Sequence, residues 1–436
     1  MFLFVASLCL AAGAGAQNLP WSLSQCIDYA LDHNLTVRQN EISAAQREIE
    51  LNTAEARRLP SVSGSASQNF SFGRGLTADN TYANTNTTST GFSLGSDVPI
   101  FQGFQIRNNI ALSRLNLAAA TVDLEKARDD IRVAVAQAYI QILYDKEILA
   151  VARRQVEIDS LQVARLEEME RQGLSSGAEV AAQQATLSQS RLTAVQAEGT
   201  LSLALLDLTQ LLELPSPEGF DVVVPSEEAL EPGLLLSPEA IYAEALGVKP
   251  AVEAEEIRLD YAKANIDLAK GAFLPSLSLS GGVGSNFYTS SGIGSAKFID
   301  QMKNNFSQYL GVSLSVPIFT RLSNRNNLRA AQLSYKNQEV QLENVKKTLY
   351  KEIQQAYYNA VNAQEKYRSS ESAAASAQEA FRLTSAKYEH GQANSTEFNE
   401  AKVRYLEAES NLARARYEQL YQTRLLDFYR GQPLSF

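Results

Sequence analysis

The run Val98–Phe101 (Val-Pro-Ile-Phe) occurs a second time in the chain, 218 residues further on, as Val316–Phe319. Other short runs recur in the same order at the same or a nearly equal offset: Leu59–Ser61 as Leu274–Ser276, Arg107–Asn109 as Arg325–Asn327, Gln137–Tyr139 as Gln355–Tyr357, and Gly173 as Gly391. Five matches in one order indicate an internal duplication. The sequence therefore predicts two repeats, at 17–212 and 237–436, that a proline-rich linker at 213–236 joins.

Proline is absent from two long stretches of the chain, residues 100–214 and 318–432. Because a proline inside a helix removes a backbone hydrogen bond and clashes with the preceding turn, such stretches favour long helices. Gly173 and Gly391 are the only turns expected within them. We predict a long helix of about 108 Å followed by a shorter helix in each repeat. These helices are expected at 101–172 and 178–212 in the first repeat, and at 319–390 and 396–429 in the second.

Each repeat is expected to open with one helix, over Leu23–Arg58 and Pro238–Phe273, which a Leu-Pro pair ends. A β-hairpin follows, at 60–100 in the first repeat and at 275–318 in the second. In Ser61–Phe72, serine or asparagine alternates strictly with less polar residues. Since successive side chains of a strand point to opposite faces, this alternation predicts strands with one polar and one apolar face.

The segment Met1–Ala16 is uncharged and apolar and ends in small residues. This pattern predicts a secretory signal peptide that is cleaved after Ala16. An N-terminal membrane anchor is the alternative, although the segment is too short to span a bilayer. Cleavage would leave Cys26 as the only cysteine, so no disulfide is expected within the chain. No other stretch is long and apolar enough to predict a transmembrane helix.

The composition argues against two classes of function. A net charge of −10 does not suit a general nucleic-acid binder. The only histidines, His33 and His390, are not accompanied by cysteines or carboxylates at the spacing of a metal site. There is also no nucleophile elbow and no glycine-rich phosphate loop. We therefore expect a protein that is not an enzyme and that needs no cofactor.

Four amphipathic strands per chain are long enough to cross a bilayer when tilted, but they are too few to close a barrel. Open strand edges are not tolerated in lipid, so several chains must combine their strands. Three chains give twelve strands and twelve helical columns. The predicted fold class is mainly α with a membrane β-barrel, a trimeric 12-stranded barrel that continues into a 12-helix α-barrel. The alternative is a periplasmic coiled-coil structural or adaptor protein without a pore, which would leave the strands without a partner sheet.

The chain resembles the TolC-like outer-membrane efflux family. The resemblance rests on the opening segment Trp21–Asn34, on Pro99–Phe104 (Pro-Ile-Phe-Gln-Gly-Phe), on Tyr388–Gly391 and on the duplicated helix–hairpin–helix plan. It implies a homotrimeric channel in the lipid of the cell outer membrane, with a tunnel in the periplasm. It also implies two protein partners, a periplasmic adaptor (membrane-fusion protein) and an inner-membrane pump. Exported small molecules or polypeptides would pass through the channel, whose energy comes from the pump.

The resemblance further implies a closed periplasmic tip, at the helical hairpin turns around Gly173 and Gly391. Family members carry acidic residues six and nine positions after the second glycine, which correspond to Glu397 and Glu400. Three chains would place six carboxylates around a narrow pore, where clustered negative charge attracts cations. A solvated helix face is the alternative reading of this pair.

Family members also hold the tip closed through polar links between the two hairpins. The matching positions are Tyr388 and Glu179. The basic residue that the family carries two positions after the second glycine is Ala393 here, so the usual salt-bridge latch is not expected. Leu174 matches the adaptor-contacting position of the first turn, whereas Gln392 occupies the corresponding position of the second.

Overall fold

The computed structural model describes residues 20–76, 81–225, 235–291 and 296–435, so the predicted signal peptide lies outside the described residues. The chain divides into two compact units. Unit 1 holds Met1–Glu41, Asp123–Glu253 and Val345–Phe436, and unit 2 holds Ile42–Val122 and Ala254–Asn344. The two longest helices, α3 (Gln105–Arg171) and α8 (Ser323–Glu389), contribute residues to both units.

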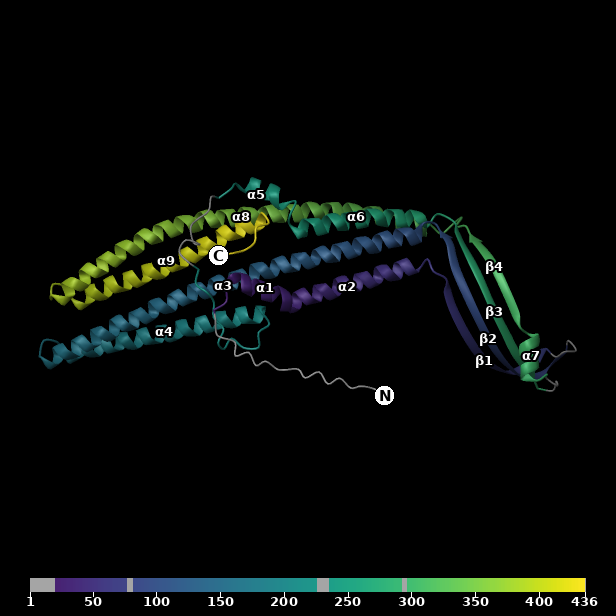
Figure 1. Cartoon of the computed structure of the whole chain (residues 1–436), viewed down its shortest axis with the longest axis horizontal. Coiled ribbons are helices and arrows are strands. Elements are labelled where there is room, and N and C mark those ends of the chain that lie inside the picture. Colours follow the sequence, from purple (N-terminus) through teal and green to yellow (C-terminus); the bar gives the residue numbers. More distant parts are fainter. Residues whose placement is uncertain (1–19, 77–80, 226–234, 292–295, 436) are drawn as a thin grey trace, which may run out of the picture. The chain divides into compact units, whose positions relative to one another are not determined.

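Unit 2 contains one antiparallel sheet, in which four strands lie side by side in the order of the sequence (Figure 1). The strands are β1 (Ser61–Leu76), β2 (Tyr82–Gln102), β3 (Ser276–Ser290) and β4 (Ser307–Ser315). The pairing of Leu94 with both Gly64 and Val283 fixes the register across the first three strands. No residue of the four strands whose burial is described is buried.

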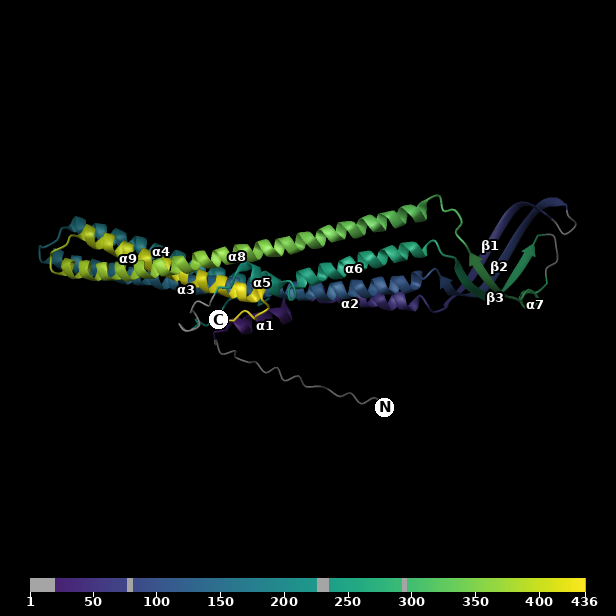
Figure 2. The same ribbon diagram turned by 90° about the horizontal axis from the view of Figure 1, so that it is seen from above.

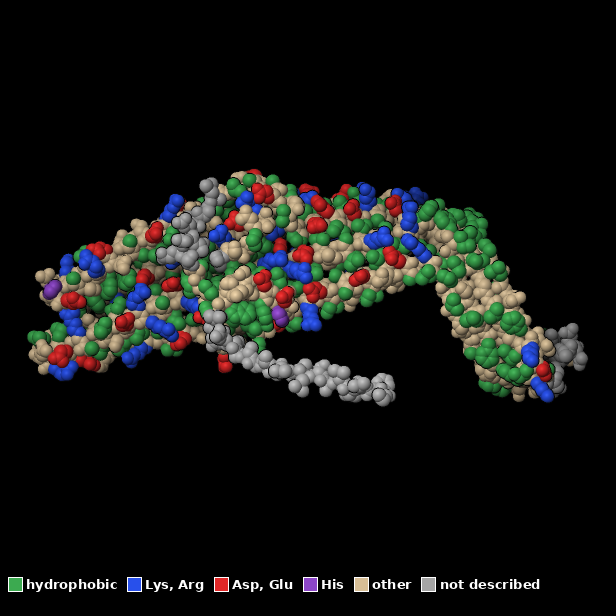
Figure 3. All heavy atoms as spheres, viewed as in Figure 1, with side chains coloured by type: hydrophobic (Ala, Val, Ile, Leu, Met, Phe, Trp, Pro, Cys, Tyr) green, Lys and Arg blue, Asp and Glu red, His purple; other side chains and the backbone are tan. Residues whose placement is uncertain are grey.

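The register separates the sheet into two chemically different faces. One face, the apolar face, carries most of the large hydrophobic side chains: Val62, Phe70, Phe72, Phe92, Leu94, Val98, Leu277, Leu279, Val283, Phe287, Leu310, Val312 and Leu314. The other face, the polar face, is lined mainly by serine, glycine, threonine and asparagine. In the space-filling view the visible side of the sheet carries patches of hydrophobic side chains among polar and backbone atoms, and charged side chains are seen only near its hairpin end (Figure 3).

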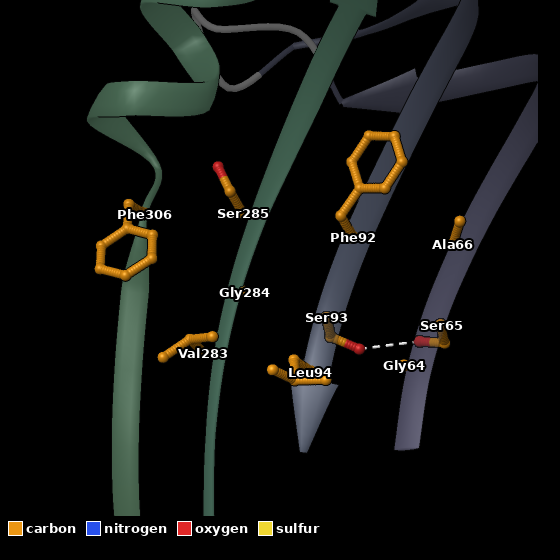
Figure 4. A pocket seen from close by; sticks show the side chains of 10 residues that line it. All are labelled: Gly64, Ser65, Ala66, Phe92, Ser93, Leu94, Val283, Gly284, Ser285 and Phe306. Atoms are coloured by element: carbon orange, nitrogen blue, oxygen red, sulfur yellow. Dashed lines mark hydrogen bonds between the residues drawn. The ribbon is translucent and has the colours of Figure 1, made fainter. Parts of the chain in front are cut away.

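A shallow groove on the sheet is lined mostly from the apolar face. Phe92 and Leu94 of β2, Val283 of β3 and Phe306 surround it (Figure 4). Ser65 and Ser93, which belong to the polar face, are joined by a hydrogen bond of 2.7 Å between their hydroxyl oxygens (Figure 4). A group of exposed large aliphatic and aromatic side chains is typical of a surface that contacts another protein, a ligand or a membrane.

The second half of the chain repeats the first, element by element. In the first half α1 (Leu23–His33) and α2 (Leu35–Ala56) precede the strands, and α4 (Gly177–Leu211) follows α3. In the second half α5 (Pro238–Ala245) and α6 (Pro250–Gly271) precede the strands, and α9 (Ser395–Tyr429) follows α8. The predicted pair of internal repeats is therefore confirmed.

Three local features differ from the expectation. The opening helix of each repeat is broken in two, at Asn34 in the first and before Pro250 in the second. Asn34 is a breaker because its side chain accepts a hydrogen bond from the backbone N–H of Thr36, 2.9 Å away. The second hairpin contains a short helix, α7 (Phe298–Asn304), that was not expected. The side-chain amide of Gln301 holds α7 to the backbone N–H and C=O of Tyr288 on β3, at 2.9 and 3.0 Å.

Unit 1 contains the main hydrophobic core, which α1, α3, α4 and α9 build. Its most deeply buried members include Cys26, Val135, Leu143, Leu208 and Tyr417. The hydroxyl of Tyr139 donates 2.6 Å to the backbone carbonyl of Val223, which ties the linker to the long helix. In two views at right angles, α8 and α9 run side by side from the turn that joins them (Figures 1 and 2). None of the described helices combines the length and hydropathy that a membrane span requires.

Candidate functional site

The two helical hairpin turns of unit 1 have the same backbone conformation. Gly173 and Gly391 adopt left-handed φ angles of +73° and +69°. After α3, the N–H of Gly173 donates to Glu170 O at 2.9 Å and the N–H of Leu174 to Met169 O at 2.8 Å. Gly391 and the residue that follows it make the corresponding pair of bonds, at 3.1 and 2.8 Å. Both turns are Schellman motifs, which favour glycine because a side chain would strain the left-handed backbone.

Each turn is followed by a capping box that uses a glutamate. At the start of α4, the N–H of Glu179 donates to Ser176 Oγ, and Glu179 Oε2 accepts from the N–H of Ser176, both at 3.2 Å. At the start of α9, the N–H of Glu397 donates 2.9 Å to Asn394 Oδ1, and Glu397 Oε2 accepts from the N–H of Asn394 at 3.1 Å. Glu179 and Glu397 therefore have equivalent local roles, because each satisfies free amides at a helix start.

The carboxylate of Glu179 has one more partner than that of Glu397. Ser175 Oγ donates to Glu179 Oε2 at 2.6 Å. This hydroxyl, together with the backbone N–H of Ser176, lowers the pKa of Glu179 below its ordinary value. Ala393 occupies the position of Ser175 in the second repeat and cannot donate.

The proposed acidic pair lies on the exposed side of α9. Glu397 and Glu400 are both exposed, whereas Phe398 between them is buried. The nearest cation to Glu400 is Arg404 on the same helix, with Nη2 3.8 Å from Oε2 and both side chains well solvated. Leu174, at the first turn, is 68% exposed. The structure thus leaves both carboxylates and the tip leucine accessible on the surface of the single chain.

Tyr388, the last-but-one residue of α8, is linked to α3. Its hydroxyl accepts a hydrogen bond from the side-chain amide of Gln162. Arg165 Nη2 donates to the backbone carbonyls of Tyr388 and Glu389, at 3.3 and 3.1 Å, and its guanidinium carbon lies 5.0 Å from the centre of the Tyr388 ring. Arg165 therefore caps the carbonyl end of α8, where a cation interacts favourably with the helix dipole.

The structure does not bring the two sequence-predicted link residues into contact with each other. Tyr388 bonds to Gln162 and Arg165 of α3, whereas Glu179 bonds to Ser175 and Ser176 within its own turn. At the end of α8, a positive charge comes from Arg165 on α3, whereas position 393 carries alanine.

A fully buried ion pair lies between the two hairpins, further from the turns. Lys402 Nζ of α9 donates to Asp159 Oδ1 of α3, and the side chains are 1% and 0% exposed. Two polar groups of α4 complete the coordination of the carboxylate: Gln183 Nε2 donates to Asp159 Oδ1 at 3.2 Å, and Ser190 Oγ donates to Asp159 Oδ2. A buried carboxylate with several donors is a satisfied group, and the same arrangement becomes costly when one partner is removed.

A third link lies beyond the buried pair. Arg154 of α3 donates to the carboxylate of Glu409 and, at 3.4 Å, to the hydroxyl of Tyr405, both on α9. The bond to Glu409 raises the pKa of Arg154, and burial raises the pKa of Tyr405. Phe381 of α8 stacks on Tyr405 with ring centres 5.4 Å apart. Helix α9 is thus held by polar links to α3 and by aromatic packing against α8.

The buried pair Asp159 and Lys402 was not found from the sequence, although a pattern marks both residues. Lys402 stands between Phe398 and Tyr405 at spacings of four and three, which is a core position of the heptad pattern. Asp159 stands four residues before Val163 and seven before Leu166, on the apolar side of α3. Opposite charges at core positions of two different helices predict a buried pair. Among the described residues, no group of histidine, cysteine or acidic side chains could hold a metal ion.

Comparison with known proteins places this geometry in a family. The model of the family described as "Outer membrane efflux protein" matches residues 26–213 and 241–432. The chain is similar to the outer membrane protein TolC of Vibrio cholerae, with 27% identity over 286 residues that cover 65% of this chain and 64% of TolC. It is also similar to the outer membrane protein OprJ of Pseudomonas aeruginosa, with 24% identity over 415 residues that cover 91% and 81%. The match thus spans less than two thirds of the TolC relative.

The fold is shared with solved structures of outer membrane channels. The CmeC outer membrane channel of Campylobacter jejuni superposes with a TM-score of 0.77 at 20% identity, covering 95% of this chain and 87% of CmeC. The fold class predicted from the sequence, mainly α with four strands per chain, is confirmed.

Proposed function

Because the chain belongs to the outer membrane efflux protein family, we propose that it is the passive exit duct of a tripartite export system. In this proposal three copies combine their strands into a barrel in the outer membrane and their helices into a periplasmic tunnel. A periplasmic adaptor and an inner-membrane pump supply the substrate and the energy. Small molecules or polypeptides leave through the duct, and the chain itself catalyses no reaction.

The observation that carries this proposal is the four-stranded sheet. Its apolar face exposes residues such as Leu310 (78%) and Phe72 (75%), and its outer strands β1 and β4 each have an unpaired edge. Water-exposed sheets with open edges and uncovered apolar faces are prone to aggregate, whereas a closed barrel in lipid satisfies both the edges and the apolar face. A periplasmic coiled-coil protein without a pore gives this face no partner and is not favoured.

The links between the hairpins support a tip that can be held closed. Arg165, which is partly exposed, joins α3 to the end of α8, and the Asp159–Lys402 pair joins α3 to α9 in the interior. The partly exposed bonds of Arg165 can be exchanged for water at a lower cost than the fully buried charge pair. We infer that the Arg165 links to the end of α8 open first and that the buried pair keeps α9 attached to α3.

Single-channel recording in a planar lipid bilayer tests the duct. Purified wild-type protein should insert as a trimer and conduct ions without a partner. Protein that remains monomeric and water-soluble, and that gives no conductance, would refute the proposal.

A second recording tests the acidic ring formed by Glu397 and Glu400. Each of the three chains contributes both carboxylates, so external Mg²⁺ should block the current at the tip. Glu400→Gln should weaken the block, and Glu397→Gln together with Glu400→Gln should weaken it further. Glu407→Gln, further along the same helix, is the matched control and should leave the block unchanged. Equal block in wild-type and doubly substituted protein would exclude these residues as the constriction.

A further inference from the structure

One row of residues across the polar face of the sheet consists of Ser63, Gly95, Gly282 and Tyr309. Ser63 pairs with Gly95, Gly95 with Gly282 and Gly282 with Tyr309. All four residues lie in one row on the same face. Tyr309 has the only large side chain of the row, and the two positions next to it are glycines. Tyr309 therefore has room to lie flat along the row.

The distances show that the Tyr309 ring lies over this glycine row. A Cβ placed on Gly282 would be 2.8 Å from Tyr309 Cε1, and one placed on Gly95 would be 3.8 Å from the Tyr309 hydroxyl. Any side chain at 282 would displace the ring, so glycine is required there for the observed position. The side chain of Tyr309 is nevertheless 62% exposed. One face of the ring rests on backbone, and the opposite face is open.

The neighbouring row of the polar face contributes a carboxylate. It contains Ser61, Asp97, Ser280 and Gly311. Asp97 is two residues from Gly95 on β2, a separation of about 7 Å along the strand. Within the described strands, no other aspartate and no glutamate, lysine, arginine or histidine shares the polar face with Asp97, which is exposed. The open tyrosine ring and the single negative charge thus lie close together on a face otherwise lined by hydroxyl, amide and backbone groups.

From this arrangement we propose that Tyr309 and Asp97 form a binding site for planar aromatic cations on the polar face of the sheet. A planar ligand can stack on the open face of the Tyr309 ring, whose electron-rich surface also attracts positive charge. The carboxylate of Asp97 supplies the second attraction for the cation. The site rests on the proposed function in one respect, since it contacts an exported solute only if the polar face lines the barrel.

Ethidium, a planar aromatic cation, is the probe for this site. Its fluorescence is titrated with purified full-length protein in a non-ionic detergent, which does not require the protein to conduct. Wild type should bind ethidium in a saturable manner. Tyr309→Leu should weaken binding about tenfold and Asp97→Asn about threefold. Tyr309→Phe keeps the ring and should bind like wild type.

Two controls separate stacking from charge and from general effects of substitution. Tyr288→Leu removes the other tyrosine of the polar face, at the hairpin end of β3, and should not change ethidium binding. Tetraethylammonium has the same charge without a planar ring and should compete only weakly for the site. Unsaturable binding by wild type, or equal binding by wild type, Tyr309→Leu and Asp97→Asn, would overturn the proposal.

The same variants in single-channel recordings separate this site from the duct itself. If ethidium blocks the wild-type current and Tyr309→Leu relieves the block, both proposals stand. If wild type fails to conduct while ethidium binding still depends on Tyr309 and Asp97, the duct is refuted and the site stands. If the current is normal and its block by ethidium is insensitive to both substitutions, the site is refuted and the duct stands.

Discussion

The tip of unit 1 and the sheet of unit 2 differ in the groups that they bury and expose. The tip buries a charged pair, Asp159 and Lys402, between helices that already pack against each other within one chain. The sheet buries no residue whose burial is described, and it exposes large hydrophobic side chains along its apolar face. The contacts of the tip are therefore largely complete in the single chain, whereas in the proposed trimer those of the sheet are completed by further chains and lipid.

This difference predicts where substitutions act. A change inside the tip acts through a specific partner that can be named. In the proposed trimer, a change on the sheet acts through the lipid or water that covers the altered face. Substitutions at adjacent residues of one strand should therefore have different effects on assembly. Three experiments follow, in order of decreasing expected effect.

The largest effect is expected for the buried pair at the tip. Lys402→Met leaves the carboxylate of Asp159 buried without its counter-charge, which costs about 3–5 kcal/mol. Hydrogen–deuterium exchange should show loss of amide protection in the first half of α9. Adding Asp159→Leu should restore most of the protection, because a matched pair of apolar side chains leaves no charge buried.

An exposed pair provides the control for this experiment. Lys366 of α8 and Glu418 of α9 are 3.3 Å apart, with side chains 59% and 35% exposed. Lys366→Met should change protection by less than about 1 kcal/mol. Equal losses for Lys366→Met and Lys402→Met would contradict the special role of the buried pair.

The second effect concerns the two faces of the sheet. Leu94 lies on the apolar face and Ser93, its neighbour on β2, lies on the polar face. Leu94→Arg should cost about 2–4 kcal/mol per chain if the apolar face meets the middle of the bilayer. The amount of trimer recovered from the outer membrane, measured on semi-native gels, should fall sharply. Ser93→Arg should leave trimer yield close to wild type and change only ion selectivity.

The reverse result would be as informative. If Ser93→Arg abolished the trimer and Leu94→Arg did not, the assignment of the two faces to lipid and lumen would be wrong. The polar-face site at Tyr309 would then face lipid, which is unsuited to a charged ligand.

The sequence predicted the regular features of this fold and missed those that depend on pairs of distant residues. Repeated runs, proline spacing and strand alternation predicted the long helices, the four strands and the two turns, because each is a local property. The break at Asn34 was missed because an asparagine that bonds to the backbone two residues further on looks, in the sequence, like any other polar residue in a helix. The Asp159–Lys402 pair was missed because its partners are 243 residues apart in the sequence.

At the two turns, sequence and structure together show more than either alone. Gly173, Gly391, Glu179 and Glu397 were identified from the sequence, and the structure places both glutamates in equivalent capping boxes. The partner expected for Tyr388 differs in the structure, where α3 supplies Gln162 and Arg165. A family resemblance identifies equivalent positions along the chain. The contact that each position makes depends on which neighbouring side chain has the required length and charge.

The smallest effect comes from Ser175, which donates to the glutamate of the first capping box and whose counterpart beside the second is Ala393. The Ser175 hydroxyl lowers the pKa of Glu179. A carboxyl whose pKa is lower in the folded state stabilises that state above its unfolded pKa, and this contribution is lost as the pH falls through the folded pKa.

The first turn of α4 should therefore lose amide protection only at a pH below the ordinary range of a glutamate. Ser175→Ala should move this loss to higher pH, because it removes the main cause of the lowered pKa. Hydrogen–deuterium exchange between about pH 6 and pH 3, corrected for intrinsic rates, measures this shift. If Ser175→Ala left the pH dependence of the first turn of α4 unchanged, the lowered pKa of Glu179 would not originate in the serine hydroxyl.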